Sequence, residues 1–405
     1  MNNKAISIDR IPYAMTVISI LTVFLPPIFI PISSSTLILY YGEITFYGLF
    51  LVAITLIFKF NKIIINKLFF ILISLLFVGF ISILNADDYG RYFIGLSTYI
   101  EITLIILVFS NIFYSDESIK KLKKYYLISS IFLCVQILYK ALIVNDGDFL
   151  IGNKIVLELG GSNYLATILM IPFFIALTFV FNKENSFLNV AFLCIIGTSI
   201  ILTGSRTALI LLIILSIVIL MKETLFNFKI KFRNKFKYLS LSLLAIFIIY
   251  LFTGKFIKQM IEVGRFDNLS NQSNALSRFQ IFEDYYNAFL NHPIIGNGLM
   301  NVNGLNQNYL AHNFILQAFG DAGFLFGVLF ITLIIYMYIY LNKVIKETNE
   351  NINFVIGFRR GYTAVLLHGL FEPNFGTKLF MLYLFLGFGL IVSENYNLKR
   401  KENVK

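Results

Sequence analysis

Three ionisable side chains lie where apolar sequence meets polar sequence, and they could do chemistry: Arg206, Arg278 and His312. A guanidinium group presents a fixed fork of N–H donors that suits a phosphate, and imidazole can take a proton from a hydroxyl group near neutral pH. Charged groups at the edge of a membrane are costly, so each of the three is a candidate functional residue. Together they could bind a phosphorylated substrate and activate a nucleophile.

The first candidate, Arg206, ends the short turn Thr203-Gly204-Ser205-Arg206. The apolar run 187–221 is too long for one membrane crossing and suffices for two short ones hinged at this turn. Gly204 permits the turn, and Ser205 can cap the helix that follows. Arg206 would then lie at the outer surface beside a helix N-terminus, which suits an anion. An arginine that only snorkels to lipid headgroups would explain the same position.

The second candidate, Arg278, lies near the start of an amphipathic segment at about 276–290. Apolar residues recur there at three- and four-residue intervals, which is typical of a helix on a membrane surface: Leu276, Phe279, Phe282, Tyr286 and Phe289. Arg278 can face the bilayer edge with this stripe, although an interfacial arginine can equally be a lipid anchor. Arg265, before the helix, is a weaker candidate.

The third candidate, His312, lies where the polar sequence re-enters the membrane. It could be the general base for a hydroxyl nucleophile, or a hydrogen-bonded structural residue. Gly320, Gly323 and Gly327 follow it, and we expect them to allow close contact between helices.

Further polar residues could line the same cavity. His368 and Glu372 precede Pro373 and are expected one turn apart on one helix face, where they could also merely pair with each other. Asn313 and Arg265 are the other candidates for a place in the cavity wall.

The elements that position these residues are membrane helices. The chain has 405 residues, of which 58% are hydrophobic and 14% charged, so it cannot fold as a soluble globule with a polar surface. We expect an all-α polytopic fold, a single membrane domain over 1–405 with one long polar loop at 254–312. About twelve apolar runs are long enough to cross a bilayer: 14–33, 36–58, 68–84, 92–113, 125–143, 163–181, 187–203, 207–221, 239–253, 316–341, 354–372 and 378–394.

The basic residues predict the orientation of these helices. With the N-terminus in the cytoplasm, about 24 of the 33 Lys and Arg residues fall on the cytoplasmic side. Both termini are then cytoplasmic, and the loop 254–312 is outside. Membrane topology and anionic lipid therefore explain the net charge of +11 without nucleic acid. The first apolar run contains three prolines and no small-residue cleavage pattern, so we expect it to remain as the first span.

The two cysteines, Cys134 and Cys194, fall in predicted spans without His or Cys neighbours at ligand spacing. We expect both to be packing residues, with neither a metal site nor a disulfide.

Several motifs follow one another in the second half of the chain: Gly204-Ser205-Arg206-Thr207-Ala208, then Arg278, then Pro293-x-x-Gly296-x-Gly298, then His312-Asn313-x-x-Leu316-Gln317-x-x-Gly320-x-x-Gly323. Their order resembles that of the O-antigen ligase and polymerase superfamily. The Gly161-Ser162-Asn163-Tyr164-Leu165-Ala166 start of the predicted sixth span is similar to that family as well. The resemblance covers about 160–390, and the first half of the chain matches only as a set of spans.

The resemblance implies a metal-independent glycosyltransferase with a GT-C-like bundle and no cofactor. Its substrate would be an oligosaccharide carried on undecaprenyl diphosphate at the outer face of a bacterial inner membrane, in lipopolysaccharide synthesis. Carried over by position, Arg206 and Arg278 would bind the donor diphosphate, and His312 would activate or orient the acceptor hydroxyl. We favour a polymerase of repeat units over a ligase that moves finished polymer to lipid A core. Membrane lipid and a chain-length regulator are the other expected partners.

A flippase or secondary transporter is the alternative from another class. Transporters of that kind usually place ionisable groups near the bilayer midplane and have matching halves. Here the outstanding charges lie at the predicted outer edge and the halves differ, which disfavours transport. A purely structural role is disfavoured because several polar groups converge on one loop.

Overall fold

The computed structural model describes most of the chain, in two compact units. The described residues are 3–32, 35–60, 63–112, 114–144, 155–182, 186–224, 254, 258, 272–302, 310–347 and 352–402. The first unit comprises Met1–Ser129, Leu276–Glu350 and Glu372–Lys405, and the second comprises Ser130–Ala275 and Asn351–Phe371. Arg265 and the predicted ninth span, 239–253, lie outside the described residues. A single domain over 1–405 stays a prediction.

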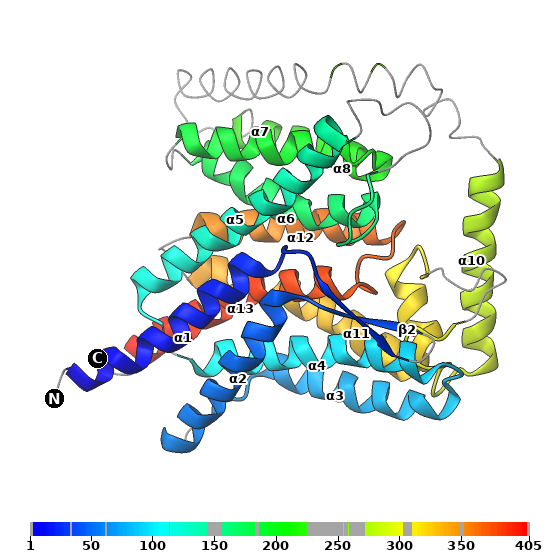
Figure 1. Cartoon of the computed structure of the whole chain (residues 1–405), viewed down its shortest axis with the longest axis horizontal. Coiled ribbons are helices and arrows are strands. Elements are labelled where there is room, and N and C mark those ends of the chain that lie inside the picture. Colours follow the sequence, from blue (N-terminus) through cyan, green and yellow to red (C-terminus); the bar gives the residue numbers. More distant parts are fainter. Residues whose placement is uncertain are drawn as a thin grey trace. The chain divides into compact units, whose positions relative to one another are not determined.

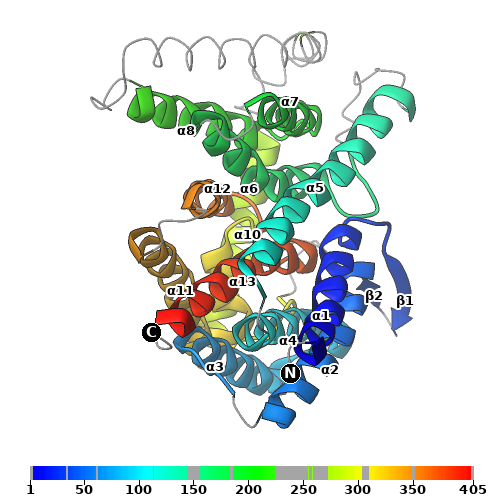
Figure 2. The same ribbon diagram turned by 90° about the vertical axis from the view of Figure 1, so that its left-hand side faces the viewer.

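The first unit is a bundle of long helices from both ends of the sequence. Its helices are α1 (Asn3–Thr22), α2 (Tyr41–Phe60), α3 (Lys67–Ile81) with the short 3-10 helix η1 (Ser82–Asn85), α4 (Tyr89–Asn111), the first half of α5 (Asp116–Tyr139), most of α10 (Gln272–Asn291), α11 (Phe314–Glu347) and α13 (Lys378–Glu402). Helix α3 packs against α4 and α11, and α13 packs against α4. Figures 1 and 2 show these helices side by side.

The second unit is a smaller group of apolar helices. It contains the rest of α5 with a π-turn, η2 (Lys140–Val144), and α6 (Ser162–Phe181), α7 (Ser186–Leu202), α8 (Arg206–Thr224) and α12 (Ile352–Gly369). Helices α6 and α12 make its closest pair. A Cβ atom at Gly361 would lie 2.6 Å from the Cα of Ile171, so a small residue is needed for this approach.

Six described helical segments are long and apolar enough to cross a membrane: Lys67–Asn85, Tyr89–Asn111, Asp116–Val144, Ser162–Phe181, Phe314–Glu347 and Lys378–Leu398. Each coincides with a predicted span. Three further apolar helices are shorter: Arg10–Thr22, Tyr41–Thr55 and Phe187–Leu202. The protein is a multi-pass membrane protein, and a total of about twelve crossings stays a prediction.

The predicted end of the first span and the predicted start of the second span are wrong. The predicted runs 14–33 and 36–58 meet in an antiparallel hairpin of β1 (Ile28–Ile32) and β2 (Ser35–Leu39), so this part of the chain is extended and not helical. Pro26 and Pro27 follow the end of α1, and Pro31 pairs with Thr36 in the hairpin. Proline cannot donate a helical hydrogen bond, and isoleucine favours extended backbone.

Helix α11 is broken in its first third. Ala322 (φ −135°, ψ 21°) and Gly323 (φ 79°, ψ −174°) are non-helical, so the carbonyl groups of Gly320 and Asp321 lose their regular helical donors. In a membrane an unsatisfied backbone group costs several kcal/mol, so replacements are required. Backbone N–H of Asn297 lies 3.3 Å from the Gly320 carbonyl and 3.0 Å from that of Asp321.

A glycine-rich turn supplies these donors. The Asn297 side chain also donates to the Gly320 carbonyl at 2.9 Å, and Phe324 N–H donates to Pro293 O at 2.7 Å. Gly296 has φ 77°, and a Cβ atom there would overlap the backbone of Ala322. A Cβ at Gly323 would overlap the carbonyl of Ile294. The turn and the broken helix therefore fit together only with glycine at both positions.

The replacement Gly296→Ala tests this fit. It forces an unfavourable φ and an overlap with backbone, so we expect a loss of about 2–5 kcal/mol of stability. The matched control is Gly161→Ala, at φ −76°, where an added Cβ meets no described atom within 4 Å. We expect the control to lie within about 0.5 kcal/mol of wild type. The midpoint temperature of heat-induced loss of the monodisperse peak in detergent measures both, and equal midpoints would contradict the fit.

Candidate functional site

His312 lies at the start of α11, where two contacts fix the chain. The Asn313 side-chain oxygen accepts hydrogen bonds from Ile315 N at 2.9 Å and Leu316 N at 3.1 Å, which caps the helix. Asn313, predicted as a cavity residue, thus has a capping role here. Tyr285 of α10 is buried and forms a hydrogen bond with the backbone of Ala311. Burial, with the nearby Asp321 charge, raises the pKa of Tyr285 well above its ordinary value, so its hydroxyl stays protonated.

Arg278 reaches the site from α10 (Gln272–Asn291), which overlaps the segment 276–290 where the sequence predicts an amphipathic helix. Tyr285 packs against Gly320 of α11, and Phe289 packs against Phe319 with ring centroids 5.6 Å apart. Phe279 and Tyr286 are exposed, as suits a face that lies on lipid. Helix α10 is therefore held against the start of α11 on one side and presents aromatic side chains on another.

Glu372 joins Arg278 to His312. One of its carboxylate oxygens accepts a hydrogen bond from Arg278 Nη2 at 2.9 Å, and the other lies 3.2 Å from His312 Nδ1. The Glu372 side chain is 3% exposed, whereas Arg278 is 39% and His312 21% exposed. A buried acceptor thus holds a cation and an imidazole that both remain accessible. All three residues belong to the first unit.

The position of Glu372 differs from the expectation. Helix α12 ends at Gly369, so Glu372 lies in the turn before α13 and shares no helix face with His368. Pro373 explains this, because a residue before proline is driven out of helical conformation. His368 instead lies in the second unit, fully buried, with Nδ1 2.9 Å from Thr167 Oγ1. The predicted contribution of His368 to the same cavity stays a prediction.

Arg206 begins α8 in the second unit, after the predicted turn. Gly204 has φ 74°, and helices α7 and α8 flank the turn, which confirms the hinge. The side-chain cap by Ser205 is wrong for the described residues: its hydroxyl has no partner there, and Leu209 N–H bonds to its backbone carbonyl. A role for Arg206 beside Arg278 stays a prediction.

A buried charge cluster at the start of α13 was not predicted. Lys378 Nζ lies 2.7 Å from Glu43 and 2.9 Å from Glu101, and Tyr47 donates to both carboxylates. Each charged member is under 10% exposed. Glu43 and Glu101 inside apolar runs were the available signal, since such charges need partners. The cluster fixes the end of the short turn that carries Glu372.

The geometry around Glu372 favours acid–base chemistry beside an anion. A neutral imidazole can donate its Nδ1 proton to Glu372, and its Nε2 atom is then an acceptor. In many sites a carboxylate partner fixes the tautomer of a histidine in this way. The three side chains carry no net charge while His312 is neutral, and one positive charge once it is protonated. Proton uptake by His312 would therefore leave the group of three side chains with one net positive charge.

Both cysteines are buried, as predicted. No curated protein matches the chain. Residues 190–345, which contain Arg206, Arg278 and His312 and stop short of Glu372, match the family model Wzy_C, described as O-antigen ligase. This part of the chain is thus similar to an enzyme family of surface-polysaccharide synthesis.

Proposed function

We propose that the protein is a glycosyltransferase that transfers an oligosaccharide from a polyprenyl diphosphate, specifically undecaprenyl diphosphate, to an acceptor hydroxyl. The observation that carries the proposal is Glu372, which holds an arginine and a histidine on one buried carboxylate. The family match supports the class of reaction. The multi-pass fold supports a substrate that stays in the membrane.

In the proposed reaction a base activates the acceptor and a cation stabilises the leaving group. His312 Nε2 takes the proton of the acceptor hydroxyl, whose oxygen then forms a bond to the anomeric carbon of the donor sugar. The bond from that carbon to the diphosphate oxygen breaks, and the diphosphate leaves with the electron pair. Arg278 stabilises its growing negative charge, with Arg206 as a second cation in the proposal. Glu372 orients the imidazole and balances the charge of the resting site.

The identity of the acceptor distinguishes a polymerase from a ligase. We favour a polymerase, in which the acceptor is the terminal sugar of another lipid-linked repeat unit, because the sequence from His312 to Gly323 is similar to that of polymerases. A ligase that transfers polymer to lipid A core is the second candidate, and the description of the matching family model favours it. In both cases the donor, the base and the cation are the same.

Reconstitution tests the reaction. Purified protein in liposomes with lipid-linked repeat units, with and without lipid A core, should give a ladder of longer products without lipid A core. Product only with lipid A core would identify a ligase. If the lipid-linked substrate crossed the bilayer intact and no product formed, the transferase proposal would be wrong and a transporter would take its place.

The pair His312 and Glu372 can be tested with matched controls. His312→Ala should lower kcat by about 10²–10⁴-fold, because it removes the base. Glu372→Gln should lower kcat less, and its effect should shrink in the His312→Ala background if it acts through the imidazole.

The controls for that pair are His292→Ala and Glu283→Gln, which change exposed residues of the same polar segment. Both should keep wild-type kcat. Equal losses in the controls, or a His312→Ala variant with normal product, would remove the site.

The role of Arg278 in diphosphate binding can be tested by comparing an alanine with a lysine replacement. Arg278→Ala should abolish most product, and Arg278→Lys should restore little, because one ammonium cannot reproduce the two parallel donors of a guanidinium. The KM for the lipid-linked donor and kcat are measured separately, with a loss expected in both. Full rescue by lysine would contradict bidentate diphosphate binding.

A further inference from the structure

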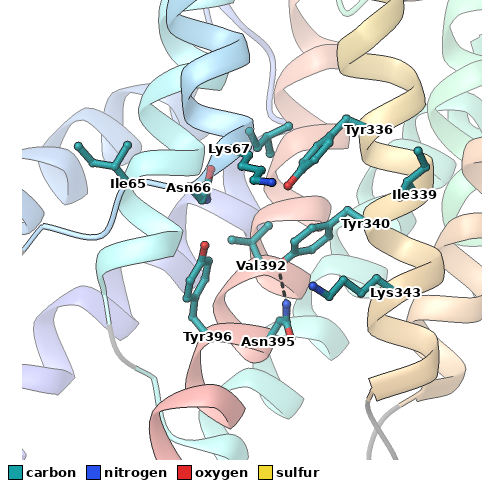
Figure 3. Close-up of a pocket in the computed structure, with 11 residues that line it drawn as sticks. Ile65, Asn66, Lys67, Tyr336, Ile339, Tyr340, Lys343, Val392, Asn395 and Tyr396 are labelled. Atoms are coloured by element: carbon teal, nitrogen blue, oxygen red, sulfur yellow. Dashed lines mark hydrogen bonds between the residues drawn. The ribbon is translucent and has the colours of Figure 1, made fainter. Parts of the chain in front are cut away.

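A cavity of about 410 Å³ lies among α3, α11 and α13 of the first unit. Its walls come from the start of α3, the last turns of α11 and the C-terminal part of α13 (Figure 3). A volume of this size falls within the range of ligand sites in proteins. Neither the proposed reaction nor the family motifs involve it.

The cavity is at the other end of the first unit from Glu372. His312 and Glu372 immediately precede α11 and α13, whereas the cavity is lined by Tyr336 to Lys343 of α11 and Val392 to Tyr396 of α13. Beyond the break at Gly323, α11 runs on for about 20 residues to Lys343, which is about 30 Å at about 1.5 Å per residue and matches the thickness of a bilayer core. The two sites therefore face opposite membrane surfaces. The basic-residue distribution predicts that the cavity is on the cytoplasmic side.

The polar lining is suited to an anion. Lys67 and Lys343 supply two ammonium groups, and the described lining residues include no carboxylate. Lys343 is 3.6 Å from Glu347, but both are largely exposed, so this pair adds little. Lys67 is the first residue of α3, whose N-terminus favours negative charge, and the Asn66 side chain accepts the hydrogen bond of Phe69 N there at 2.7 Å.

The Tyr340 hydroxyl group in the cavity can donate a hydrogen bond to a ligand. Asn395, which is 3% exposed, donates a hydrogen bond from Nδ2 to Tyr340 Oη at 2.9 Å. The Tyr340 oxygen is thus used as an acceptor, which leaves its own proton for a ligand. Figure 3 shows Tyr336 and Tyr396 around the same space. Two cations and phenol groups together match the oxygen atoms of a phosphate ester.

Apolar surface continues from the cavity along both outer helices. Ile339 lines it and is 56% exposed, and Ile335, one turn earlier in α11, is exposed as well. On α3, Phe70 and Ile73 are likewise exposed. In a bilayer these side chains face acyl chains. A ligand with a charged head and apolar tails can fill the cavity and follow these faces, which an inorganic anion cannot.

We infer that this cavity binds the phosphate headgroup of an anionic phospholipid from the leaflet opposite the proposed reaction site. Lys67 and Lys343 hold the phosphate, Tyr340 donates to it, and the acyl chains lie on α3 and α11. The aromatic belt of an ordinary membrane protein also gathers tyrosine and lysine at the interface, but it makes no cavity lined by cations on two helices.

The experiment uses the full-length protein, delipidated in mild detergent. Phosphatidylglycerol, phosphatidylcholine or inorganic phosphate is added, and the midpoint temperature of heat-induced loss of monodisperse protein is measured. We expect phosphatidylglycerol to raise the midpoint by at least about 3 °C, with phosphatidylcholine and inorganic phosphate giving less. Native mass spectrometry should show phosphatidylglycerol retained.

The matched variants are Lys67→Gln/Lys343→Gln and Lys120→Gln/Lys346→Gln. All four lysines are exposed, so both variants lose the same charge without disturbing the core, but only the first pair lines the cavity. The first variant should lose the phosphatidylglycerol shift, each of its single variants should lose part of it, and the second should keep it.

Equal shifts in the two double variants, or in the single variants and wild type, would overturn the site. An equal shift from inorganic phosphate, lost in the first variant, would show a soluble anion as the ligand and overturn the lipid assignment. The readout is binding and stability, so it stands whether or not transferase activity is found.

Discussion

The requirement that every backbone polar group find a partner inside lipid controls the arrangement of the first unit. Helix α11 breaks at Ala322 and Gly323, and the turn Pro293–Gly298 supplies the hydrogen bonds that the break removes. The same turn is bound to the η1–α4 connection, because Asn85 Nδ2 donates to Gly296 O at 2.8 Å and the Asn301 side chain accepts from Asp88 N at 2.7 Å. A polar segment is thus anchored to the broken helix by its own backbone, and the helix before it, α10, is fixed in turn. The break in one helix is what gives the loop a defined place.

The candidate site depends on this anchoring because its residues come from three separate segments. Arg278 comes from α10, His312 from the start of α11 and Glu372 from the turn before α13. Tyr285 joins the first two segments, and the cluster around Lys378 secures the third. Glu372 is 94 residues from Arg278 and 60 residues from His312 along the chain. A carboxylate that is nearly inaccessible to water can hold two exposed partners in a fixed geometry, since it has few competing donors.

The local features of the site could be predicted from sequence, and the long-range ones could not. The spacing of apolar residues predicted α10, and Gly204 predicted the turn before Arg206, because both depend on nearest neighbours. The broken helix was not predicted, because 316–341 was interpreted as one span and Gly323 was expected only to allow close packing. The hairpin at 28–39 was hidden in the same way. Glu372 was named as a cavity residue, but its two partners are 60 and 94 residues away along the chain, and no local pattern encodes such a contact.

The cluster of Lys378, Glu43 and Glu101 also imposes an order on biosynthesis. Glu43 and Glu101 are on α2 and α4 and are made early, whereas their cation is on the last helix of the chain. Two carboxylates facing the interior of an apolar bundle are costly until that ammonium arrives. The charge balance of the first unit is therefore complete only when α13, the last described helix, has been inserted.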